Sequence, residues 1–147
     1  MLNKIINKPY LFFFGLIPVF LILGFLKRNI PIDINISFIY YLINVDFWCY
    51  VSAIYFGLIG VNYLSLKLVK KKPKKVLTIL HISLQTLCLL PYLYAVFKLD
   101  ENGILPNDKF FYNVEPTYIF LFAFFLFIIS VIIHLINFFS SLLLKRD

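Results

Sequence analysis

The sequence predicts an all-α integral membrane protein, in which four transmembrane helices form an antiparallel bundle with both termini in the cytoplasm. Of its 147 residues, 62% are hydrophobic, whereas soluble domains average about 45 to 50%. Four apolar runs each approach the roughly 20 residues that a helix needs to cross a bilayer, and basic residues stand at their ends. The chain is therefore expected to form a single membrane domain over residues 1–147.

The first expected span covers residues 10–26 and ends at Lys27 and Arg28. A basic start followed by an apolar run also describes a signal peptide, but no small-residue cleavage site follows this run. We therefore interpret it as an uncleaved helix. Pro18 within it predicts a kink, or a neighbouring helix that accommodates the ring.

The second expected span covers residues 40–67 and leaves two interpretations open. The chain is largely apolar from Ile36 to Leu66, and a helix of that length would measure about 46 Å, which is more than an upright crossing needs. Either the helix tilts and protrudes, or residues 36–45 lie along the membrane surface and the span starts at Asp46. Aromatic side chains typical of headgroup depth crowd this end; they are Tyr40, Tyr41, Trp48 and Tyr50.

The third and fourth expected spans cover residues 76–97 and 117–144. A polar outer loop, residues 98–116, separates them and contains the Gly, Pro, Asn and Asp residues that favour turns. A basic loop, residues 67–75, precedes the third span. Its six lysines are Lys67, Lys70, Lys71, Lys72, Lys74 and Lys75.

The distribution of basic residues predicts the orientation. Ten of the 14 Lys and Arg residues stand on the side of the N-terminus, the basic loop and the C-terminus. Short segments rich in Lys and Arg stay in the cytoplasm, so we expect the basic loop and both termini on the cytoplasmic side. We expect the protein itself in the inner (plasma) membrane. The loop lysines can also attract anionic lipid headgroups, although control of topology explains them more simply.

The net charge of +7 does not predict nucleic-acid binding, because most cations flank apolar runs, where they anchor helix ends. Cys49 and Cys88 form no C-x-x-C pair and fall at different places along their spans, so we expect no disulfide. The sequence contains no G-x-S-x-G motif, H-E-x-x-H motif or P-loop. We therefore expect no catalytic activity and no metal site.

Polar residues within the spans recur three or four residues apart, so that they share one face of each helix. In the third span these residues are Thr78, His81, Gln85, Cys88 and Tyr92, and in the fourth they are Ser130, His134, Asn137 and Ser141. The second span offers Asn62, and Ala53 with Gly57 in a spacing that lets another helix approach closely. We expect an intramembrane cluster, hydrogen-bonded between helices, of Asn62, Thr78, His81, Gln85, His134 and Asn137.

His81 and His134 also suggest a cofactor site, because histidines on two facing helices of a bundle can hold a haem between them. Counted from the lysines at the cytoplasmic surface, their depths differ by about 7 Å, so they would grip a tilted ring rather than form a matched pair. Asp46 suggests another site, because a carboxylate in an apolar stretch can mark a proton or ion pathway. Its place beside Trp48 favours an interfacial carboxylate that reaches water.

Residues 32–48, IDINISFIYYLINVDFW, follow a pattern close to L-D-I-x-x-H-D-T-Y-x-V-x-A-H-F-H-Y, with Asp33, Ile34 and Tyr40 in matching positions. Further on, LTILHISLQTL places His81 on the histidine of a K-I-H-F-W helix start. Over roughly residues 8–90 the chain thus resembles the catalytic subunit of haem-copper terminal oxidases (cytochrome oxidase subunit I).

The haem ligands of that family are absent from the resembling stretch. Val45 and Phe47 stand where the two histidines of A-H-F-H ligate the haems, and neither side chain can coordinate iron. His81 matches a family histidine that is not a haem ligand. The resemblance therefore implies a small bacterial inner-membrane protein that keeps the helix scaffold and lacks the redox centre.

These observations favour a non-catalytic membrane protein that is structural or accessory to a membrane complex, with another membrane protein or a second copy of itself as partner. Two alternatives stay open. One is a haem-binding or electron-transfer subunit that uses His81 and His134, and the other is a proton or solute carrier that uses Asp46.

Overall fold

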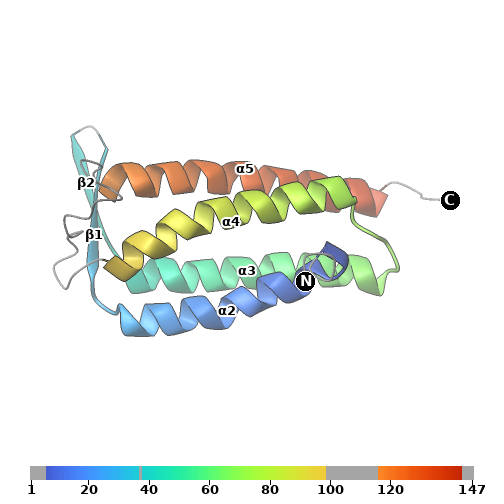
Figure 1. Cartoon of the computed structure of the whole chain (residues 1–147), viewed down its shortest axis with the longest axis horizontal. Coiled ribbons are helices and arrows are strands. Elements are labelled where there is room, and N and C mark those ends of the chain that lie inside the picture. Colours follow the sequence, from blue (N-terminus) through green and yellow to red (C-terminus); the bar gives the residue numbers. More distant parts are fainter. Residues whose placement is uncertain (1–5, 37, 99–115, 144–147) are drawn as a thin grey trace.

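The computed structural model describes residues 6–36, 38–98 and 116–143. In this part of the chain four long helices run alongside one another, and a two-stranded hairpin lies across one end (Figure 1). Each helix is long and apolar enough to cross a membrane, which confirms the predicted number of candidate spans. The elements are α2 (Pro9–Leu26), β1 (Pro31–Ile36), β2 (Ile39–Asn44), α3 (Val45–Leu68), α4 (Lys75–Lys98) and α5 (Pro116–Leu143).

The fold is helical as predicted apart from one hairpin, which corrects the predicted bounds of the second span. Residues 40–44, expected in the second span, belong to β2, which pairs antiparallel with β1 from Pro31 opposite Asn44 to Ile36 opposite Ile39. Both strands are rich in isoleucine or tyrosine, which favour extended chain, and Pro31 is tolerated because it is the first residue of its strand. Helix α3 therefore starts at Val45, near the start that the second interpretation gave it, but a strand precedes it.

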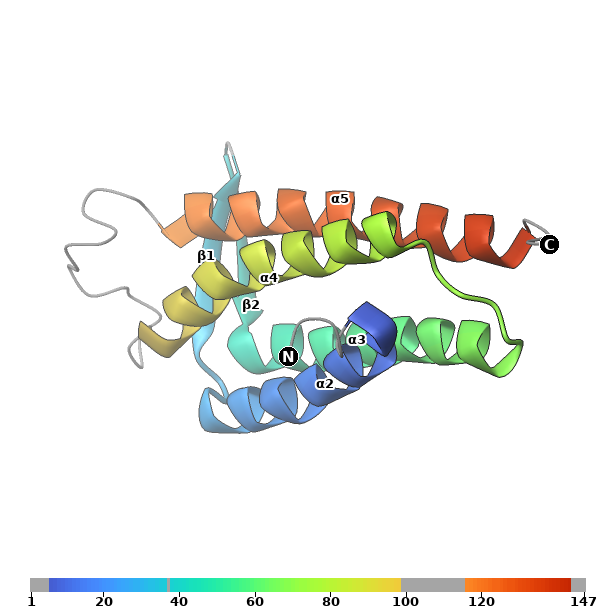
Figure 2. The ribbon, with the colours of Figure 1, turned by 45° about the vertical axis from the view of Figure 1, so that its right-hand side comes forward.

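The four helices form two pairs, since α2 packs along α3 and α4 packs along α5 (Figure 2). Large aromatic side chains bridge the wider space between the pairs. The ring of Phe13 on α2 stacks on His81 of α4 at 4.9 Å between centroids, and Phe20 stacks on Tyr92 at 6.2 Å. Both phenylalanines are fully buried, so the centre of the core consists of rings rather than of helix backbones in close contact.

Two glycines let α2 and α3 approach closely. A Cβ atom added at Gly60 would lie 2.4 Å from Cε1 of Phe14, and one added at Gly24 would lie 3.1 Å from Cβ of Cys49. Gly57, the glycine that the spacing indicated, is not the position of closest approach, because among the described residues its added Cβ would make an ordinary contact with Ile17 Cδ1 at 3.7 Å. Ala53, its predicted companion, is buried.

The basic loop begins with a regular helix end. Lys70 adopts a left-handed conformation with φ of 57°, its N–H donates to the Lys67 carbonyl at 3.0 Å, and the Lys71 N–H donates to the Leu66 carbonyl at 2.8 Å. These two bonds form a Schellman motif, which satisfies the last carbonyl groups of α3 and turns the chain toward α4.

Two lysines of this loop also tie other helices to the same end of the bundle. Lys67 Nζ donates to the Tyr10 hydroxyl of α2 at 2.9 Å and lies 4.8 Å above the centre of that ring. Lys71 Nζ donates to the Leu142 carbonyl near the end of α5. The start of α2, the basic loop and the end of α5 therefore lie together (Figure 1). The predicted outer loop, residues 98–116, falls outside the described residues except at its two ends.

Candidate functional site

The structure brings the predicted polar cluster together between α3, α4 and α5. Five of its six members are at most 1% exposed, namely Thr78, His81, Gln85, His134 and Asn137. Asn62, on α3, is part-buried and contacts His134. An unsatisfied polar group is costly in an apolar surrounding, which explains why these side chains point at one another rather than outward.

Asn137 closes the cluster at the end nearest the basic loop. Its Nδ2 donates to Thr78 Oγ1 at 2.9 Å, and its Oδ1 accepts the Lys74 N–H at 3.0 Å. A side chain of α5 thereby caps the N-terminus of α4, where the first N–H groups have no partner within their own helix. Bonds of this kind between membrane helices contribute roughly 0.6 to 2 kcal/mol each.

The two histidines lie next to each other at the centre of the bundle. Their ring centroids are 4.9 Å apart. Nδ1 of His81 is 2.9 Å from the Tyr63 hydroxyl, and Nε2 of His134 is 3.2 Å from Asn62 Nδ2. The Asn62 amide and the His134 ring therefore form a hydrogen bond between α3 and α5.

The predicted depth difference of about 7 Å between these histidines is wrong. That estimate placed the start of α4 and the end of α5 at one level. The Lys74 N–H instead bonds to Asn137, eight residues before Lys145 in the sequence, so α5 continues past the start of α4. This stagger brings His134 level with His81.

The packing around the histidines does not fit a haem held between them. The His81 ring stacks on Phe13 at 4.9 Å, and the His134 ring lies 5.0 Å from Tyr63. With the two imidazoles also in contact with each other, a macrocycle would have to part rings that are already packed. One ring nitrogen of each, His81 Nε2 and His134 Nδ1, has no hydrogen-bond partner among the described residues.

Gln85 occupies the next level of the cluster, toward the hairpin. Its Oε1 accepts the Ser130 hydroxyl at 3.0 Å and the Tyr55 hydroxyl at 3.5 Å. The carbonyl oxygen has two lone pairs, so both donors can be served by this one atom. The amide nitrogen Nε2 is buried and has no partner in the part of the chain that the structure describes.

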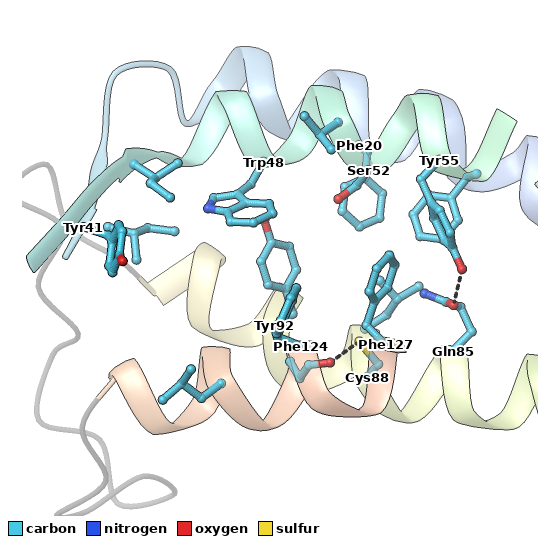
Figure 3. A pocket seen from close by; sticks show the side chains of 17 residues that line it. Phe20, Tyr41, Trp48, Ser52, Tyr55, Gln85, Cys88, Tyr92, Phe124 and Phe127 are labelled. Carbon is cyan, nitrogen blue, oxygen red and sulfur yellow. Dashed lines mark hydrogen bonds between the residues drawn. The ribbon is translucent and has the colours of Figure 1, made fainter. Parts of the chain in front are cut away.

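Beyond Gln85 lies a cavity of about 360 Å³, which we call the interhelical cavity. Its walls come from all four helices and from the hairpin, which contributes Ile32, Tyr41 and Ile43. Trp48, Ser52 and Tyr55 of α3 face Phe124 and Phe127 of α5 across it, and the Gln85 amide lies beside Tyr55 at one end (Figure 3). The two histidines do not line it.

Three features of this site were not predicted from the sequence, namely Tyr55, Tyr63 and the cavity itself. The 4,3-spacing of Trp48, Ser52 and Tyr55 would have indicated a common face of α3. No local pattern indicates the cavity, because its width depends on how far apart the two helix pairs stand.

Asp46 lies in the first turn of α3. A carboxylate there is stabilised by the partial positive charge of the helix N-terminus, which explains its presence without an ion pathway. Its Oδ1 atom is buried and has no hydrogen-bond partner within the described ranges.

The predicted resemblance to the oxidase subunit stays a prediction. No protein-family model, curated protein or solved structure matches this chain.

Proposed function

We propose that this protein is a non-catalytic integral membrane protein that binds a lipophilic small molecule in the interhelical cavity. The observation that carries the proposal is the cavity itself, which measures about 360 Å³ and is walled by aromatic and aliphatic side chains. Ligand pockets are concave, about 300 to 1,000 Å³ in volume and mostly apolar, with a few polar groups that orient the ligand. Gln85, Ser52 and Tyr55 are such groups here.

An occupant would also stabilise the fold. Side chains around an empty space lose dispersion contacts, and in proteins this loss grows with the volume left unfilled. A lipophilic molecule between the helix pairs restores those contacts, and it can enter from the bilayer without crossing water. The outer faces of the helices support a location in the bilayer, since large apolar side chains such as Ile22, Ile54 and Phe125 are each at least 60% exposed.

We further propose that the end carrying the basic loop faces the cytoplasm of the inner (plasma) membrane. Ten of the 14 Lys and Arg residues belong to the two termini and this loop, and cytoplasmic segments are enriched in such residues. The cavity then lies in the outer half of the bundle. Alkaline phosphatase fused at Asn102 should be active and a fusion at Pro73 inactive; the reverse result contradicts this orientation.

Trp48 provides the test of ligand binding, because it lines the cavity and is the single tryptophan of the chain. Diphenylmethane, an uncharged two-ring hydrocarbon, should give saturable binding with one molecule per chain when titrated into the detergent-purified protein. Calorimetry measures the binding, and a shift in the fluorescence emission of Trp48 shows that the probe lies in the interhelical cavity. Heat that only rises linearly, as in empty micelles, with unchanged emission from Trp48 contradicts the proposed function.

A further inference from the structure

We infer that the ligand of the interhelical cavity presents a carbonyl oxygen to the side-chain amide of Gln85. This inference rests on the proposed function and names the chemistry of the ligand. It follows from one juxtaposition, in which the fully buried Gln85 forms part of an apolar cavity wall and its amide nitrogen has no hydrogen-bond partner among the described residues.

The amide is held in a defined orientation. Ser130 on α5 and Tyr55 on α3 both donate to Oε1, so the acceptor side of the amide is turned to the protein. The two N–H bonds of Nε2 remain, and a buried donor without an acceptor costs free energy. A group that accepts a hydrogen bond at this point therefore binds better than an apolar group of the same shape.

The cavity surroundings select a carbonyl among possible acceptors. A charged acceptor such as a carboxylate would lose its hydration in a cavity walled by rings and aliphatic chains, and the described lining contains no cation to compensate it. A hydroxyl accepts but also carries a proton that needs its own acceptor. The carbonyl oxygen of a ketone or an ester accepts a hydrogen bond and carries neither a charge nor a proton of its own. Both an aromatic ketone and a lipid ester therefore fit this chemistry.

Three probes with one skeleton separate these groups. Diphenylmethane, benzophenone and diphenylmethanol differ only at the carbon between the two rings. One hydrogen bond contributes about 0.5 to 1.5 kcal/mol net, so the wild-type protein should bind benzophenone about 2- to 13-fold more tightly than diphenylmethane. Diphenylmethanol should fall between them.

The Gln85→Met variant keeps the length of the side chain and removes the amide. Its affinities for benzophenone and diphenylmethane should be equal, so that the preference for benzophenone is lost. Thr86→Val is the matched control, because Thr86 is exposed at the next position of α4 and its hydroxyl donates to the Ile82 carbonyl of the same helix; this variant should retain the preference.

Gln85→Met leaves the hydroxyl groups of Ser130 and Tyr55 without their acceptor, so a second measurement uses the wild-type chain. Irradiated benzophenone links to C–H groups beside its carbonyl, and the adduct should map to residues around Gln85, such as Tyr55 and Phe127. Adducts confined to Tyr41 and Trp48, at the hairpin side of the cavity, would overturn the inference.

The outcomes distinguish the inference from the proposed function. If all three probes bind equally, or diphenylmethanol binds most tightly, the carbonyl assignment is overturned while the cavity remains a binding site. If none binds, both are overturned. Methyl decanoate tests the source of the carbonyl. An affinity equal to that of benzophenone supports a lipid ester as the occupant, and weaker binding supports an aromatic ketone.

Discussion

Replacing Ser52 by phenylalanine should reduce the affinity for diphenylmethane by about 100-fold, which corresponds to about 2.7 kcal/mol. Ser52 lies on α3 with its side chain directed into the interhelical cavity (Figure 3). A phenyl ring at this position occupies the space that a ligand ring needs and supplies its own contacts to Phe124 and Phe127. Because the space exists beforehand, the added ring should not lower the thermal stability of the protein. Calorimetry and Trp48 emission measure the loss.

The matched control is Ile54→Phe, two residues along the same helix. Ile54 is 66% exposed on the outer face, so a ring there adds similar hydrophobic bulk without entering the cavity. Affinity should remain within twofold of the wild type. If Ser52→Phe binds diphenylmethane as well as Ile54→Phe does, the probe lies elsewhere and the cavity is not its site.

Replacing Gly60 by valine should destabilise the protein by about 2 to 3 kcal/mol. The added Cβ would lie 2.4 Å from Cε1 and 2.6 Å from Cδ1 of Phe14, which is far closer than two carbon atoms can pack. Relief requires Phe14 to leave its position or α2 to move away from α3, and overpacking of this kind costs about 1 to 3 kcal/mol. The apparent melting temperature in detergent, followed by circular dichroism, measures the effect.

Gly15→Val is the control for this prediction, because a Cβ atom at Gly15 would meet no heavy atom of the described residues within 4 Å. It lies on α2 of the same helix pair and should change stability by less than about 0.5 kcal/mol. Equal melting temperatures for the Gly60 and Gly15 variants would show that close contact at Gly60 does not hold the pair together.

The polar cluster shows how far periodicity predicts a site. Thr78, His81 and Gln85 share a helical face in the sequence, and the structure buries all three against α5. Their partners did not follow from the pattern: Tyr63 for His81 and Tyr55 for Gln85 come from α3. Spacing along one helix indicates which face is buried, whereas the rotation of the neighbouring helix decides which residue it meets.

The hairpin shows where the apolar pattern was ambiguous. Residues 36–66 read as one long apolar stretch, and hydrophobicity alone does not separate a strand from a helix. The chain changes conformation between Asn44 and Val45, where β2 ends and α3 begins. Pairing with β1, closed by the hydrogen bond from the Val45 N–H to the Ile30 carbonyl at 2.9 Å, stabilises the extended form.

The sequence by itself determined the four helices long enough to cross a membrane, the ends of three of them, and the buried polar faces of α4 and α5. Each of these depends on residues near one another in the chain, because apolar length and helical spacing are local properties. The tertiary structure alone decided the close contact at Gly60, the meeting of His81 with His134, and the cavity bounded by Ser52 and Gln85. These depend on the stagger, rotation and separation of helices, which arise only when distant segments pack together.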